Sequence, residues 1–127
     1  MNRDQLKAKV LGILTRHVGR EKAIGMGELY ERVYGKPWNH RINDTRGLRY
    51  LITELRYKGY LIGETRSRAG GGYYLARSES ELEEFFSRRT QEALKKLKMV
   101  SCMKNLGLGE FLGQLSLELQ GVRDEAA

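Results

Sequence analysis

Apolar residues in the middle of the chain recur at the spacing of an amphipathic helix. Four side chains at the i, i+3, i+4, i+7 positions predict a helix over residues 44–58 that buries one face: Leu48, Leu51, Ile52 and Leu55. Asp44 or Thr45 can accept the free N–H groups of its first turn, and Gly59 can end it in a left-handed conformation. At roughly 100° per residue, the opposite face is basic, aromatic and hydroxylic, with Arg46, Arg49, Tyr50, Thr53 and Tyr57.

A hairpin pattern follows this helix. Two short runs rich in Tyr, Leu and Ile, residues 60–65 and 72–76, are separated by a glycine-rich segment that contains Arg66 and Arg68. Glycine adopts positive φ angles without a Cβ clash, and it lets a backbone approach another surface closely. We therefore predict an exposed basic loop over residues 65–72.

The residues before position 44 predict two further helices and a short strand. Apolar positions from Leu6 onward form a helical stripe that Asp4 can cap, and residues 28–34 form a shorter helix closed by Gly35. Residues 20–27 suit a strand that joins the hairpin. In the connection 36–43, Trp38 either packs the loop onto the core or forms an exposed aromatic contact; we favour packing, because large aromatic side chains are usually well buried.

The order helix, strand, basic loop and strand resembles the recognition helix and wing of a winged helix-turn-helix domain. The residues that carry the resemblance are Arg49, Ile52, Leu55, Arg56, Gly59, Tyr60, Ile62 and the run GGYYL at 71–75. Residues 1–79 look most similar to the N-terminal domain of biotin-operon-repressor-type regulators and to small phage or prophage proteins. The resemblance implies an α+β, mainly helical fold: three helices plus a small antiparallel β-sheet with a wing, followed by a long C-terminal helix. The connection 36–43 is longer than the three or four residues usual in this motif.

This resemblance implies a DNA-binding protein. It would be a transcriptional regulator or a phage or prophage replication-type protein that reads double-stranded DNA with helix 44–58 and wing 65–72. The residues expected to contact DNA are Thr45, Arg46, Arg49, Tyr50, Thr53, Arg66, Arg68 and Arg41. The alternative is a winged-helix protein–protein interaction module without specific DNA binding, since one fold hosts many functions.

The charge of the chain favours a polyanionic partner. It carries 23 Lys and Arg against 16 Asp and Glu, and its pI is about 9.7. The positive excess lies within residues 1–79, while residues 80–127 hold slightly more acidic than basic side chains. Because neutralised phosphates release condensed counterions, a basic module of this kind gains affinity for nucleic acid.

A long helix without proline or internal glycine is predicted over residues 80–106, where Ser80 and Glu83 match a capping box. At 1.5 Å per residue it would span roughly 40 Å, more than the width of the preceding domain. We predict a homodimer, and the alternative is a helix that folds back on its own domain. The expected dimerisation seam consists of Leu82, Phe86, Ala93, Leu97 and Val100.

Residues 107–127 form a glycine-hinged apolar tail. The pattern over 108–120 fits a helical stripe and also the alternation of a strand. Such a segment can dock on a protein partner or complete the dimer core.

Other classes of function lack support in the sequence. No stretch approaches the roughly 18 apolar residues that span a bilayer, and the polar N-terminus lacks a signal-peptide core, so we expect no membrane association and a cytoplasmic location. Cys102 stands alone, and neither it nor the two histidines form a triad or metal-binding pattern. No phosphate-cradling glycine loop precedes a helix. We expect no catalytic residue, no metal and no cofactor, and a protein that is not an enzyme.

Overall fold

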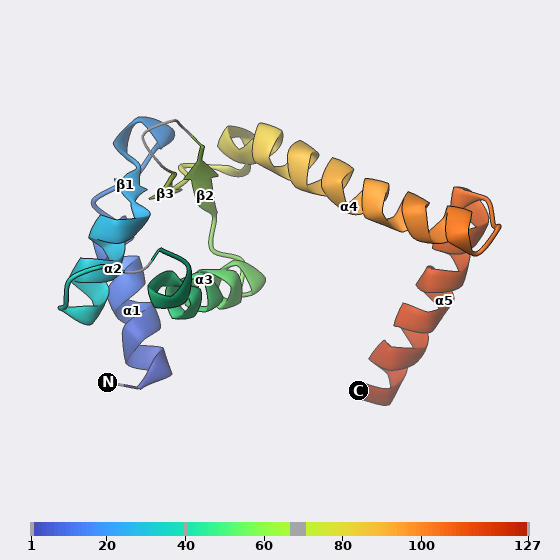
Figure 1. Cartoon of the computed structure of the whole chain (residues 1–127), viewed down its shortest axis with the longest axis horizontal. Coiled ribbons are helices and arrows are strands. Elements are labelled where there is room, and N and C mark those ends of the chain that lie inside the picture. The colour runs from blue at the N-terminus through green and yellow to red at the C-terminus, as the bar shows by residue number, and fades with distance from the viewer. Residues whose placement is uncertain (1, 40, 67–70, 127) are drawn as a thin grey trace. The chain divides into compact units, whose positions relative to one another are not determined.

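The chain is mainly helical with one small antiparallel sheet, and this confirms the predicted α+β class. The computed structural model describes residues 2–39, 41–66 and 71–126, and it divides into two compact units, Met1–Phe85 and Phe86–Ala127. The elements of the first unit are α1 (Arg3–Leu14), the 3-10 turn η1 (Arg20–Lys22), β1 (Ile24–Gly25), α2 (Met26–Tyr34), α3 (Arg41–Tyr57), β2 (Ile62–Thr65), β3 (Gly72–Leu75) and the 3-10 turn η2 (Glu79–Leu82) (Figure 1). Helix α4 (Glu83–Met103) begins in the first unit and continues through the second, where α5 (Leu108–Ala126) follows it.

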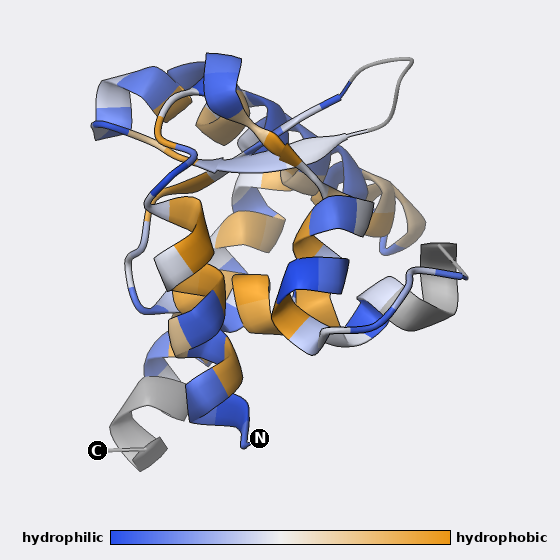
Figure 2. Cartoon of the chain, turned by 90° about the vertical axis from the view of Figure 1, so that its left-hand side faces the viewer, coloured by the Kyte–Doolittle hydropathy of each residue, from blue (hydrophilic) through white to orange (hydrophobic). Residues whose placement is uncertain are grey.

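The core of the first unit lies between its three helices and the sheet. The four predicted apolar side chains of α3 are each at most 3% exposed, which confirms the predicted inner face of this helix. They pack with apolar side chains of α1 and α2, including Val10, Leu14, Leu29 and Val33. In Figure 2 the orange, apolar positions of these helices face the space between them. Burial of this kind, at roughly 25 cal/mol per Å² of apolar surface, holds the three helices together.

The sheet has the order β1-β3-β2, with both neighbours antiparallel to the central β3. Ile24 pairs with Tyr73, and Ile62 pairs with Leu75, so the predicted strand before α2 does join the predicted hairpin. The approach of β1 to β3 leaves no room for a side chain at Gly72, where a Cβ would lie 2.7 Å from the Ile24 carbonyl oxygen. The glycine at this position is therefore required by the chain's own sheet.

Two helix starts differ from the sequence-based prediction. Asn2, and not Asp4, caps α1: its side chain accepts the Gln5 N–H at 2.8 Å, and the Gln5 side chain accepts the Asn2 N–H at 3.0 Å. Helix α3 begins at Arg41 instead of residue 44. The nearest upstream residue that forbids a helix is Pro37, so nothing in the sequence stops α3 at Asp44.

The helix ends agree better with prediction. Gly35 ends α2 with φ 68°, and Gly59 follows α3 with φ 97°. Both angles lie in the left-handed region, which glycine enters without a Cβ penalty.

A second apolar cluster lies on the other face of the sheet. Successive residues of a strand point to opposite faces, and Tyr74 therefore packs with Ala76 and Leu82, while Tyr73 belongs to the helical core. Leu82 is fully buried in this cluster of its own chain, so its assignment to the dimerisation seam is wrong. The reason is that residues 79–82 form a 3-10 turn before α4, which changes the direction of Leu82 relative to the later helical positions.

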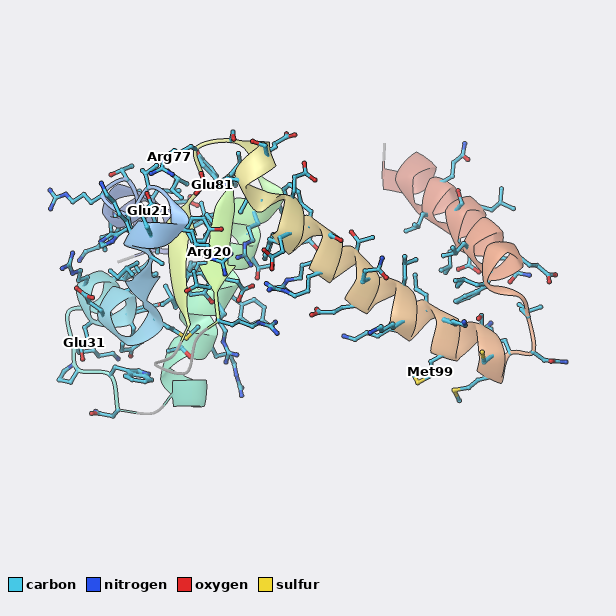
Figure 3. All side chains as sticks on the ribbon, turned by 90° about the horizontal axis from the view of Figure 1, so that it is seen from above. Arg20, Glu21, Glu31, Arg77, Glu81 and Met99 are labelled. Carbon is cyan, nitrogen blue, oxygen red and sulfur yellow. The ribbon has the colours of Figure 1, made fainter. Side chains whose placement is uncertain are left out.

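The predicted capping box is also absent at the start of α4. Ser80 lies inside η2, where its hydroxyl is 2.8 Å from that of Ser78, and α4 begins only at Glu83. The ordering of this segment comes from charged side chains that join η1 to η2. Arg20, Glu21, Arg77 and Glu81 lie together where the chain leaves the sheet (Figure 3).

Glu81 is the centre of that charged cluster. Its carboxylate accepts the backbone N–H groups of Arg20 at 3.1 Å and of Arg77 at 3.0 Å. The Arg77 guanidinium also donates to Glu21, and this hydrogen bond lowers the pKa of the Glu21 carboxyl from its usual value. These contacts hold the first turn after the sheet against the segment between α1 and β1.

The second unit contains the rest of α4 and all of α5. The Leu106 N–H donates to the Ser101 carbonyl at 2.9 Å, and Asn105 has a positive φ of 56°, so the chain turns sharply between the two helices. Residues 108–120 are helical, which decides between the helix and the strand that the sequence allowed. Ser101 and Phe111 are buried beside this turn.

The close packing of the second cluster gives a stability prediction. A Cβ at Gly63 would lie 2.6 Å from the Tyr74 hydroxyl oxygen and 2.8 Å from Leu82 Cδ2, whereas a Cβ at Gly12 in α1 would meet nothing within 4 Å. Gly63→Ala should therefore destabilise the first unit by about 1–3 kcal/mol through overpacking. Gly12→Ala, the matched control, should stabilise it by about 1 kcal/mol through helix propensity. Urea unfolding followed by the fluorescence of Trp38, the single tryptophan, measures both. Equal midpoints for the two variants would contradict the packing described.

Candidate nucleic-acid interface

The outward face of α3 is defined here as Arg46, Arg49, Tyr50, Thr53 and Tyr57. All five side chains are exposed, as predicted; Tyr50 is 60% exposed and Tyr57 is 89% exposed. The Thr53 hydroxyl donates to the Arg49 carbonyl at 2.9 Å, so its oxygen remains able to accept a hydrogen bond. The face thus offers two guanidinium groups, two phenols and one hydroxyl.

The side chain of Glu54 is directed away from the outward face of α3. Glu54 is the only acidic residue among positions 45–57. Its carboxylate pairs with Arg3 at 2.8 Å and Lys7 at 3.2 Å, both on α1. The hydrogen bond from Lys7 to Glu54 raises the pKa of that lysine. Among residues 45–57, the one carboxylate is therefore paired with cations of α1 and lies away from the exposed Arg46 and Arg49.

Arg46 and Arg66 differ from the arginines that serve the fold. Arg32, Arg56 and Arg77 each pair with a carboxylate within the first unit. Neither Arg46 nor Arg66 forms an ion pair with any side chain that the structure describes. Both are exposed, Arg46 on α3 and Arg66 directly after β2, and both can accept an anionic partner without breaking an internal contact.

For three of the residues predicted to contact DNA, the structure does not show an exposed side chain. Thr45 is only 1% exposed, because it lies three residues before Leu48 and so falls on the buried face of α3; it is removed from the interface. The backbone of Arg41 begins α3, but its side chain lies outside the described residues. Arg68 lies wholly outside them.

Trp38 connects the loop before α3 to α2. The Trp38 ring lies against Gly27, where an added Cβ would be 2.6 Å from a ring carbon, and the Trp38 backbone N–H donates to the Glu31 carboxylate at 3.2 Å. Glu31, labelled in Figure 3, projects from α2 toward this loop. The ring remains 38% exposed, so Trp38 packs the loop onto the surface of α2 and does not enter the core.

Arg56 is a residue whose role sequence reasoning missed. Its Nε–H donates to the Ile62 carbonyl at 2.9 Å, and its guanidinium carbon lies 4.9 Å from the centre of the Phe85 ring and 6.0 Å from that of Tyr73. Arg56 thus joins the end of α3 to the hairpin and to the first turn of α4. Its position at the boundary of the apolar stripe, one residue after Leu55, was the available signal.

Comparison with models of known protein families, with curated proteins and with solved structures found no match. Among the described residues, none of the helices has the length and apolar character needed to cross a membrane. The function of the α3 face must therefore be argued from its own chemistry.

The contacts of Arg56 predict a structural phenotype. Arg56→Ala removes a charge-assisted hydrogen bond and two cation–π contacts from a half-buried side chain, and it should destabilise the first unit by about 2 kcal/mol. Arg46→Ala removes the same charge from an exposed position and should stay within about 0.5 kcal/mol of the parent. Urea unfolding followed by Trp38 fluorescence compares the two. A parent-like midpoint for Arg56→Ala would exclude this role.

Proposed function

We propose that the protein binds double-stranded DNA through the outward face of α3, in a winged helix-turn-helix arrangement. The observation that carries the proposal is the separation of charge on α3: Arg46 and Arg49 are exposed on one side, and Glu54 is bound to α1 on another. The element order and the pairing of β1 with the hairpin support the fold assignment. In that arrangement α3 is the recognition helix and the β2–β3 connection is the wing.

The side chains of the face suit the major groove. The groove of B-form DNA admits an α-helix, and a planar guanidinium can bind guanine O6 and N7 together. Arg46 and Arg49 would read guanine edges or phosphates. Tyr50 and Thr53 would add hydroxyl contacts, which commonly go to phosphate oxygens.

The wing would hold the protein in position on the duplex and would read little of the base sequence. Arg66 follows β2 at the edge of the loop, and its contact would be with phosphates or the minor groove. In biological terms, the protein would be a transcriptional regulator or a phage or prophage replication-type protein, because both need such a reader of duplex DNA.

A protein-interaction module is the second candidate function. The observation that favours it is the strong exposure of Tyr50 and Tyr57, since tyrosine is enriched at protein–protein interfaces. The two functions differ in their response to salt. Log affinity for DNA falls linearly with log salt, with a slope near −0.9 per neutralised phosphate.

The test uses the full chain and a duplex obtained by binding-site selection from random sequences. Arg49→Ala should weaken binding by about 1–3 kcal/mol and relax the preference at one base pair, because one bidentate contact is lost. Arg46→Ala with Arg49→Ala should weaken it further. Gel-shift titration at several salt concentrations measures both effects.

Arg32→Ala is the matched control for that experiment. It removes the same charge from α2, where Arg32 is paired with Glu28 at 2.8 Å, and it should leave the affinity close to that of the parent. If the double variant binds as tightly as the parent, α3 does not contact DNA. If the parent shows no salt-dependent retention of any duplex, the protein-interaction module is the better account.

A further inference from the structure

Much of the apolar stripe of α5 is exposed within the described part of the second unit. Leu108, Phe111, Leu112, Leu115 and Leu119 recur at helical spacing along it. Phe111 is buried at the turn, but exposure increases along the helix, and Leu119 is 68% exposed. A stripe of this kind normally faces a packing partner.

The stripe of α4 is exposed in a similar way. Its residues Ala93, Leu97 and Val100 are exposed or half-buried. Within the described residues 86–121, α4 and α5 make little contact with each other beyond the turn that joins them. Most helical stability in proteins comes from the packing of an amphipathic face, and these two faces have little such packing within the second unit.

The charges of the two helices are complementary. Between residues 86 and 103, α4 has five basic side chains and one acidic one, Glu92. Between residues 108 and 121, α5 has Glu110 and Glu118 and no basic side chain. At roughly 100° per residue, Lys96 lies at one border of the α4 stripe, and Glu118 lies beside the α5 stripe. The helices also match in length, with 21 and 19 residues.

We propose that two copies of the chain pair through residues 86–126, with α5 of each copy packed on α4 of the other. The interface would bring the Leu97 and Val100 stripe of one copy against the Leu112, Leu115 and Leu119 stripe of its partner, and Lys96 near Glu118. Such an interface is two-fold symmetric and closed, because each copy offers both surfaces. This inference stands independently of DNA binding.

The turn between the helices argues for pairing in trans. Lys104 lies with its ammonium 5.9 Å from the centre of the Phe111 ring, and Phe111 and Ser101 are buried at the corner. Because α4 and α5 make little contact with each other, folding α5 back along its own α4 would have to change the turn that buries Phe111 and Ser101. A second copy can cover both stripes while the corner stays closed.

The experiment reverses charge on one helix at a time in the full chain. One variant carries Glu118→Lys, and the other carries Lys96→Glu. Light scattering at micromolar concentration should give the parent a mass twice the 14.6 kDa of one chain, and each variant alone the mass of one chain. An equimolar mixture of the variants should regain the doubled mass, because both exchanged helix pairs are then again of opposite charge.

Lys9→Glu with Lys36→Glu is the control for net charge; both lysines are exposed in the first unit, and this variant should dimerise like the parent. Trp38 fluorescence checks that the first unit is folded in every variant. A parent of single-chain mass would overturn the proposal and leave the stripes to a different protein. Dimerisation of the Glu118→Lys variant alone would overturn it in favour of pairing through α4 only. A mixture that remains at single-chain mass would also overturn it.

Discussion

Helix α3 buries Leu48, Leu51, Ile52 and Leu55 between α1, α2 and the sheet, and the rest of the first unit depends on this contact. Burial of one stripe determines which side chains of the same helix remain outside. It also places Glu54 beside Arg3 and Lys7 of α1. The packing that stabilises the domain therefore also removes the acidic charge from the face that carries Arg46 and Arg49.

The hairpin is tied to α3 by a different kind of contact. Arg56 reaches from the end of the helix to the Ile62 carbonyl and the rings of Tyr73 and Phe85. The sheet itself is crowded, with no space for side chains at Gly63 or Gly72. An exposed arginine after β2, such as Arg66, is consequently carried on a strand that is fixed to the proposed recognition helix.

Much of this arrangement could be predicted from periodicity. The inner and outer faces of α3, the hairpin and the strand that joins it follow from apolar spacing and from glycine positions. The burial of Thr45 also follows from periodicity, because it lies three residues before Leu48; its assignment to the DNA-contacting residues overlooked this spacing. The spacing of Leu82 fits the helical seam of residues 86–100. The 3-10 turn over residues 79–82 instead directs its side chain into the cluster with Tyr74 and Ala76. Residues 108–120 carry both periodicities, so only the structure identifies them as a helix. The sequence predicts that the candidate site is exposed. The contacts that Glu54 and Arg56 make with other elements are known only from the structure.

The central claim is that the outward face of α3 is the surface that meets DNA. The most direct measurement is a titration of the isotope-labelled full chain with the selected duplex, followed through its backbone amide resonances. The account predicts that the largest shifts fall on residues 46–57 and near Arg66, with small shifts on α1 from Arg3 to Lys9. Largest shifts on α1 or on residues 86–121, with α3 unmoved, would contradict it.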